Sequence, residues 1–147
     1  MAKTTRVKKP KKKLRTLGNM IKDADAWFSR WIRLSYSDAK GYATCISCEA
    51  RLHWKEMHNC HFIKRSNYFY RRSEENCRPW CNSCNTYRTD FHYMVFTIKM
   101  IKQYGLEYVD KMRATKWELR KIKRDYVQEI IDKYKEKVKN HILYSEK

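Results

Sequence analysis

Two pairs of cysteines carry the clearest chemical signal in the sequence. Cys45 and Cys48 form one C-x-x-C pair, and Cys81 and Cys84 form a second. A gap of two residues lets one tight turn present both sulfurs to one ion, and four thiolates suit the tetrahedral coordination of structural Zn²⁺. In a reducing cytosol such pairs indicate metal binding, whereas disulfides belong to secreted chains. We therefore predict a structural zinc site, with four unrelated buried cysteines as the alternative.

The segment between the two pairs, residues 49–80, is longer than a simple zinc ribbon allows, so the zinc site must enclose an inserted element. Two further cysteines, Cys60 and Cys77, lie inside it. We interpret both as small buried residues. A disulfide between them, or exchange of one with a zinc ligand, is the alternative interpretation.

Polar residues that suit phosphodiester hydrolysis lie in the insert and directly after it: His58, His61, Asn76 and Asn85. A neutral imidazole can accept the proton of a water near neutral pH. A hard cation such as Mg²⁺ or Mn²⁺ can stabilise charge on the phosphate while using only one or two protein ligands. Simpler roles are open as well, because Asn85 can cap a helix and Asn76 can be a turn residue.

The charge of the chain predicts a polyanionic partner. Its formal net charge is +18, from 34 Lys and Arg against 16 Asp and Glu, and each neutralised phosphate of a nucleic acid releases counterions. No stretch approaches the roughly 20 apolar residues that span a bilayer, and no signal peptide is visible. We therefore expect a cytoplasmic protein that binds nucleic acid and has no membrane partner.

Basic and aromatic side chains alternate in and around the insert. Basic side chains hold phosphates and aromatic rings stack on unpaired bases, although the same rings can simply pack a small core. Residues 1–16 form a basic arm that we expect to be disordered until it meets nucleic acid, with a solubilising tail as the alternative. The predicted DNA-binding residues are Lys11, Lys12, Lys13, Lys64, Arg65, Arg71, Arg72, Arg78 and Arg88, and the accompanying rings are Phe62, Tyr68, Phe69, Tyr70, Trp80 and Tyr87.

The spacing of apolar residues along the chain predicts the helices and strands that position these residues. Apolar residues at spacings of three and four predict a helix over 17–40, ended by Gly41. Residues 42–80 lack this period and indicate short strands and loops. A second helix is predicted from Asn82 to Gly105, then a short one over 106–112, then a long terminal helix after the capping pattern of Thr115 and Glu118. We expect one domain over 17–147, with a zinc-braced core at 42–90 and a helical part at 90–145.

The order of these residues resembles the HNH, or His-Me finger, nucleases, in which paired C-x-x-C motifs commonly brace the active site. Over residues 18–140 the chain resembles more closely the Rap/NinG recombination proteins of lambdoid phages. The similarity lies in the Met20–Ala24 helix, Cys45–Cys48, the His61 segment, Glu75-Asn76 and Cys81–Asn85. It continues through Ile101…Tyr104-Gly105…Val109-Asp110 and Trp117…Ile122-Lys123…Tyr126.

The resemblance implies a mainly helical α+β fold with a ββα-metal core, braced by zinc and flanked by terminal helices. It implies a structure-selective endonuclease that cuts branched DNA, notably Holliday junctions and D-loops, in the host cytoplasm. His61 would be the general base, Asn85 a ligand of catalytic Mg²⁺ or Mn²⁺, and Asn76 the residue that ties down the loop and orients His61.

The chain departs from both family patterns at the metal-binding carboxylate. Many HNH members have an Asp directly before the catalytic His, where this chain has Cys60. Rap/NinG proteins have an Asp three residues before it and a Gly just before it, and here these are His58 and Cys60. We therefore predict His58 as the second ligand of the catalytic metal. An imidazole suits Mn²⁺ better than Mg²⁺.

Resolution of a four-way junction needs two symmetric cuts, so we predict a two-fold homodimer with an interface on the helices around 17–40 and 115–140. Two other functions compete with junction cleavage. One is a zinc-dependent module that binds nucleic acid without catalysis, and the other is an HNH nicking endonuclease of a different role.

Overall fold

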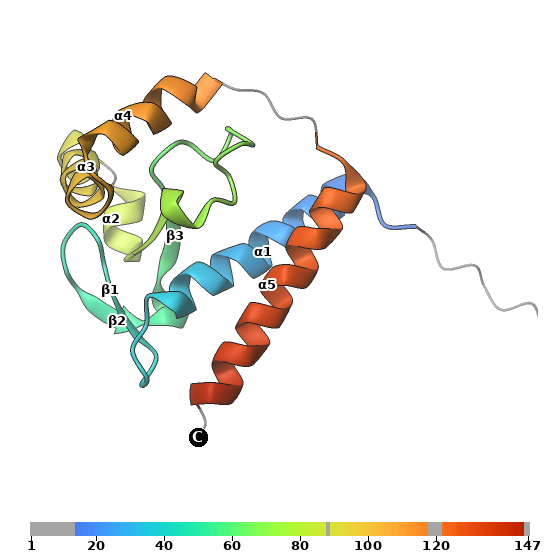
Figure 1. Ribbon diagram of the computed structural model, residues 1–147. Helices are drawn as coiled ribbons and strands as arrows, with labels where there is room; N and C mark the ends of the chain where they lie inside the picture. Colours follow the sequence, from blue (N-terminus) through green and yellow to red (C-terminus); the bar gives the residue numbers. More distant parts are fainter. Residues whose placement is uncertain (1–13, 88, 118–121, 146–147) are drawn as a thin grey trace, which may run out of the picture.

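The computed structural model describes residues 14–87, 89–117 and 122–145, and it is a mainly helical α+β fold, as predicted (Figure 1). In chain order its elements are α1 Leu17–Ser35, β1 Tyr42–Thr44, β2 Arg51–His53, β3 His58–His61, β4 Cys77–Trp80, α2 Asn82–Thr86, α3 Asp90–Tyr104, α4 Leu106–Ala114 and α5 Arg124–Ser145. Short 3₁₀ turns cover Trp54–Glu56, Glu74–Asn76 and Thr115–Trp117. No helix of the described residues has the length and apolar character needed to cross a bilayer.

Helices α1 and α5 lie side by side and run in the same direction (Figure 1). The Thr16 side chain accepts a hydrogen bond from the backbone N–H of Asn19 and so caps α1. The apolar faces of the two helices meet in a buried cluster. Its members are Met20, Ala24, Phe28 and Ile32 from α1, Val127, Ile130, Ile131 and Tyr134 from α5, and Cys77.

This packing bears on the predicted dimer interface. The helices around 17–40 and 115–140 were expected to join two chains, but their apolar stripes are buried against each other within one chain. Further apolar side chains of the two helices, among them Trp27, Val138 and Ile142, line a groove on their outer side. The dimer and its interface on these helices both stay predictions.

The ends of the first and last helices differ from prediction. Helix α1 ends at Ser35 instead of near residue 40, because the Asp38 carboxylate accepts hydrogen bonds from the backbone N–H groups of Lys40 and Tyr42 and closes a turn. Gly41 lies in this turn with a φ of 80°. Thr115 ends α4 and does not begin the last helix, which starts at Arg124. Glu118, its predicted capping partner, lies outside the described residues.

The predicted helix from Asn82 to Gly105 is two helices. Helix α2 ends at Thr86, and α3 begins at Asp90 after a separate cap, in which the His92 imidazole accepts from the Thr89 backbone N–H. Gly105, with a φ of 86°, ends α3 as predicted. The short helix expected over 106–112 is confirmed as α4.

Two antiparallel hairpins make up the strands. Strands β1 and β2 pair Tyr42 with His53, and strands β3 and β4 pair His58 with Trp80 and His61 with Cys77. The second hairpin lies between two cores, because Cys60 and Trp80 belong to a cluster with α3 and α4, whereas Cys77 belongs to the α1–α5 cluster. Cys60 and Cys77 are both buried in these clusters, which agrees with their interpretation as small core residues.

Candidate functional site

The four cysteines of the two C-x-x-C pairs come together as predicted, and we call them the cysteine knuckle. Their sulfurs all lie within 4.8 Å of one another, and the sulfurs of Cys48 and Cys81 are 3.7 Å apart. Sulfurs that bind one zinc ion at about 2.3 Å in a tetrahedron lie about 3.8 Å apart. The arrangement is therefore compatible with one structural zinc ion.

The local backbone builds this knuckle from two turns. Glu49 has a φ of 62°, which turns the chain back after Cys48, and the Cys45 N–H donates to the Ala50 carbonyl. On the other side the backbone N–H of Cys84 donates to the Cys81 sulfur. Burial and the neighbouring sulfurs raise the pKa of the Cys84 thiol. Burial also raises the pKa of the Cys81 thiol, whereas a hydrogen bond from the Ala50 backbone lowers that of Cys48. A bound dication would favour the thiolate form of its ligands.

The knuckle positions Asn85 beside His58. Helix α2 begins directly after Cys81, and Asn85 lies on it, one residue beyond Cys84. Its side-chain amide is 3.5 Å from Nδ1 of His58, which stands opposite Trp80 at the start of β3. Two ligands of one octahedral cation, each about 2.1 Å from the ion, lie about 3 Å apart. The contact is made by the Asn85 amide nitrogen, so the two side chains could share an ion once the amide turns to present its oxygen; His58 is exposed and Asn85 is half-buried.

His61 lies at the other end of β3, where its imidazole meets the loop between the strands. Its Nε2 is 2.9 Å from the backbone carbonyl oxygen of Arg71. A carbonyl only accepts, so Nε2 carries the hydrogen and Nδ1 keeps a lone pair. The pKa of His61 is lowered, first by burial and then by the charges of Arg65 and Arg71, while the hydrogen bond to the carbonyl and the Asp25 charge oppose the shift. The imidazole is therefore neutral near pH 7, as a general base must be.

Asn76 stabilises the loop that contacts His61 through hydrogen bonds to its backbone. The side chain is fully buried and makes three hydrogen bonds: Oδ1 accepts from the Ile63 N–H at 2.6 Å, and Nδ2 donates to the carbonyls of Ile63 and Tyr70 at 3.0 and 3.1 Å. The next carbonyl after Tyr70 is that of Arg71, which receives the His61 hydrogen bond. This geometry agrees with the predicted role of Asn76 as the residue that orients His61 indirectly.

The structure does not bring His61 against Asn85, although the roles of general base and metal ligand implied by the family resemblance would place them in one site. Side chains three residues apart on a strand point to opposite faces. His58 therefore faces α2 and the knuckle, whereas His61 faces α1. The predicted site is divided into a His58–Asn85 pair at one end of β3 and His61 at the other.

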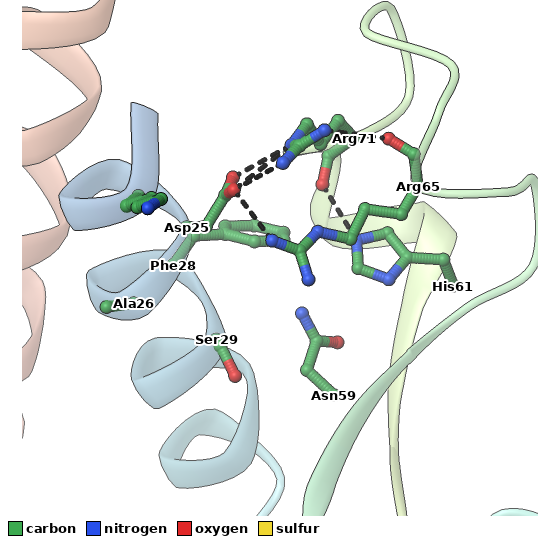
Figure 2. Close-up of a pocket in the computed structure, with 9 residues that line it drawn as sticks. Asp25, Ala26, Phe28, Ser29, Asn59, His61, Arg65 and Arg71 are labelled. Atoms are coloured by element: carbon green, nitrogen blue, oxygen red, sulfur yellow. Dashed lines mark hydrogen bonds and ion pairs between the residues drawn. The ribbon is translucent and has the colours of Figure 1, made fainter. Parts of the chain in front are cut away.

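His61 lines a pocket of about 340 Å³ between α1 and the loop (Figure 2). The other lining residues are Lys22, Asp25, Ala26, Phe28, Ser29, Asn59, Arg65 and Arg71. Asp25 is the charged lining residue of functional interest that the sequence did not predict. The one available signal was its position in the apolar stripe of α1, between Ala24 and Phe28, where an acid needs a partner.

The predicted DNA-binding residues divide into exposed and buried groups. Lys64 and Arg65 are exposed, and Arg71 is half-buried. Arg72 and Arg78 are buried: Arg72 binds Asp25, and Arg78 donates to the carbonyls of Glu74, Glu75 and Cys77, to Gln103 and to the Tyr104 hydroxyl. We therefore assign both a structural role instead of the DNA contact predicted from sequence. Lys11, Lys12, Lys13 and Arg88 lie outside the described residues.

The accompanying aromatic residues divide in the same way. Phe62, Tyr70 and Trp80 are buried in the core with α3 and α4. Tyr68 and Phe69, on the loop beside Arg65 and Arg71, and Tyr87, after α2, remain exposed. Only the exposed rings are placed to stack on a nucleic-acid base.

The fold and site define a mainly helical α+β protein in which a four-cysteine knuckle braces a strand pair followed by a helix. The family model described as bacteriophage lambda NinG protein matches residues 2–142. The chain therefore belongs to the NinG family. No curated protein and no solved structure gives a significant match.

Proposed function

We propose that this NinG-family protein is a metal-dependent endonuclease that cuts branched DNA, such as Holliday junctions and D-loops. The observation that carries the proposal is the state of His61, a neutral imidazole with one nitrogen bound to the Arg71 carbonyl and the other available as a proton acceptor. It lines a pocket with Arg65 and Lys22, which are cations suited to a phosphate. A positioned base and a stabilised phosphate are what hydrolysis of a phosphodiester requires.

In this proposal the residues have separate tasks. His61 takes the proton of the attacking water, and Asn76 keeps the loop carbonyls in place behind it. His58 and Asn85, on the opposite face of β3, would hold a divalent cation, which when bound would supply neutralisation of a DNA phosphate there. The knuckle holds α2 in place, so zinc acts on the geometry of Asn85 and not on the reaction.

Branched substrates are favoured by the exposed aromatic residues as well as by the family resemblance. Tyr68, Phe69 and Tyr87 are exposed within or near the basic segments. A perfect duplex hides its base faces, whereas a junction centre offers unstacked bases to such rings. The combination of cations and exposed rings suits DNA with interrupted pairing.

The test compares synthetic DNA substrates of one sequence context: a four-way junction, a flap and a linear duplex, each with Mg²⁺ or Mn²⁺. We expect cleavage of the junction and little cleavage of the linear duplex. Equal cleavage of all three would indicate a nicking enzyme of another role. The metal site is tested by His58→Asp, which we expect to raise the rate with Mg²⁺ relative to Mn²⁺, because a carboxylate suits the harder ion.

A second candidate function is a zinc-dependent module that binds nucleic acid without cutting it. The observation that favours it is the separation of His61 from the His58–Asn85 pair on opposite faces of β3. Protein that binds junction DNA but leaves it intact with every divalent metal would support this function instead.

A further inference from the structure

Asp25 of α1 is the centre of a cluster of three arginines from the loop between β3 and β4. Its carboxylate binds Arg65 at 3.1 Å, Arg71 at 2.6 Å and Arg72 at 2.8 Å. Burial would raise the pKa of Asp25, but the hydrogen bond from Arg71 and the charges of the arginines lower it overall. The group is therefore ionised, and one negative charge faces three positive ones. The cluster keeps an excess of two positive charges beside His61.

The three arginines are held very differently. The Arg72 side chain is only 2% exposed and also donates to the Ile21 carbonyl. Arg71 contacts Asp25 through two nitrogens, and its third donates to the Arg65 carbonyl. Arg65 is 60% exposed and contacts Asp25 through one nitrogen alone. Arg71 and Arg72 thus fasten the loop to α1, whereas most donors of Arg65 remain available to a ligand.

The position of Arg65 directs those donors into the His61 pocket. Figure 2 shows its side chain extending from the loop toward Asp25, with His61 and Asn59 along the same wall. Lys22 of α1 lines the pocket as well. A guanidinium presents paired N–H donors that match the oxygens of a phosphate. The pocket therefore joins a phosphate-binding group to a proton acceptor.

We propose that Arg65, assisted by Lys22, binds the DNA phosphodiester that lies next to His61, and that Asp25 is the positioning residue that aims Arg65. The proposal rests on the proposed nuclease function and names the phosphate site within it. Asp25 is not a metal ligand here, because its oxygens already bind three arginines and the surrounding positive charge repels a cation.

The chain offers a matched control on the β1–β2 hairpin. Arg51 is paired with Asp38 as Arg65 is paired with Asp25, and its side chain is 59% exposed against 60% for Arg65. Arg51→Gln and Arg65→Gln therefore remove the same charge from two equally exposed arginines. Both side chains are exposed, so neither substitution should prevent folding.

The experiment measures junction binding without divalent metal and single-turnover cleavage with Mn²⁺ for wild type, Arg65→Gln, Arg51→Gln and Asp25→Asn. We expect Arg65→Gln to lower cleavage by about 10- to 100-fold, as loss of a charge-assisted hydrogen bond does, and to reduce the salt slope of binding by about 0.7 to 0.9. Arg51→Gln should stay within about twofold of wild type in cleavage.

Asp25→Asn distinguishes the positioning of Arg65 by Asp25 from the effect of the Asp25 charge on DNA binding. The substitution removes one negative charge, so DNA binding should be unchanged or tighter. Arg65 then lacks the carboxylate that positions it, so cleavage should fall by about tenfold or more. Parallel losses of binding and cleavage would show a purely structural role for Asp25 and overturn its assignment. If Asp25→Asn fails to fold, Arg65→Gln alone decides the proposal.

The outcomes also separate this proposal from the proposed function. If wild type cuts junctions and Arg65→Gln cuts as well as Arg51→Gln, the phosphate site is wrong while the nuclease stands. If wild type cuts nothing, the nuclease proposal fails. In that case a reduced salt slope for Arg65→Gln, but not for Arg51→Gln, still supports the phosphate site, and equal slopes overturn it.

Discussion

Asn76→Ala should destabilise the protein strongly, because it removes a buried side chain with three hydrogen bonds. The loss leaves the N–H and carbonyl of Ile63 and the carbonyl of Tyr70 without these partners. Each such bond contributes about 1 kcal/mol net, so we expect a loss of about 3 kcal/mol in the free energy of unfolding. In a domain of this size that corresponds to a fall of about 9 °C in Tm.

The assay is urea and thermal unfolding followed by circular dichroism, with zinc-loaded protein throughout. Asn140→Ala is the matched control, because Asn140 is an exposed asparagine on α5. Asn76→Asp adds a second comparison: it keeps an acceptor for the Ile63 N–H but replaces the amide donor with an oxygen that faces two carbonyls. We expect it to be at least as destabilising as Asn76→Ala at neutral pH. A loss for Asn76→Ala no larger than that for Asn140→Ala would refute the reasoning.

Three further predictions concern the metal, the pH dependence and the thiols. Zinc chelation should lower Tm and the helical signal because metal binding and folding are coupled in such knuckles, and metal-free protein with native stability would contradict this. In the proposed mechanism cleavage requires neutral His61, and burial lowers the pKa of this imidazole from its ordinary value of 6.5. The rate measured across pH should therefore fall only below pH 6.5, as the imidazole gains a proton, and a midpoint above that value would count against it. Buried Cys60 and Cys77 should resist iodoacetamide in folded, zinc-loaded protein and react after unfolding, as mass spectrometry would show; rapid labelling of folded protein would disprove their burial.

Local patterns were enough to predict much of the fold and the four-cysteine cluster. The C-x-x-C spacing predicts the cysteine knuckle because each pair sits on one short turn. Helix periodicity predicts α1 and α3, and Gly105 ends α3 because its positive φ suits glycine. The absence of period in residues 42–80 predicts the short strands and loops found there. All of these features depend on residues that are close in sequence.

The features that the sequence did not predict depend on contacts between distant segments. Asp25 meets Arg65, Arg71 and Arg72 only because the loop folds back on α1. Arg78 appeared basic and exposed, but α3 supplies Gln103 and Tyr104 as partners for it in the interior. Composition cannot distinguish a buried, paired arginine from one that binds phosphate.

Pairing between strands also decided the arrangement of the site. His58 and His61 are close in sequence, but the alternation of β3 turns them to opposite faces. Asn85 meets His58 because α2 follows the knuckle directly. The sequence therefore predicted that His58 and Asn85 would lie together, but not that His61 would face away from them.

The most direct measurement is the single-turnover rate of four-way junction cleavage by zinc-loaded wild type, His61→Ala and the control His53→Ala, with Mg²⁺ or Mn²⁺. His53 lies on β2, away from the pocket of His61. Loss of a general base should reduce the rate by about 10²- to 10⁴-fold in His61→Ala, whereas His53→Ala should cut at close to the wild-type rate. Cleavage by His61→Ala at the wild-type rate, or no cleavage by wild type with either metal, would contradict the assignment of this protein as a nuclease with His61 as its base.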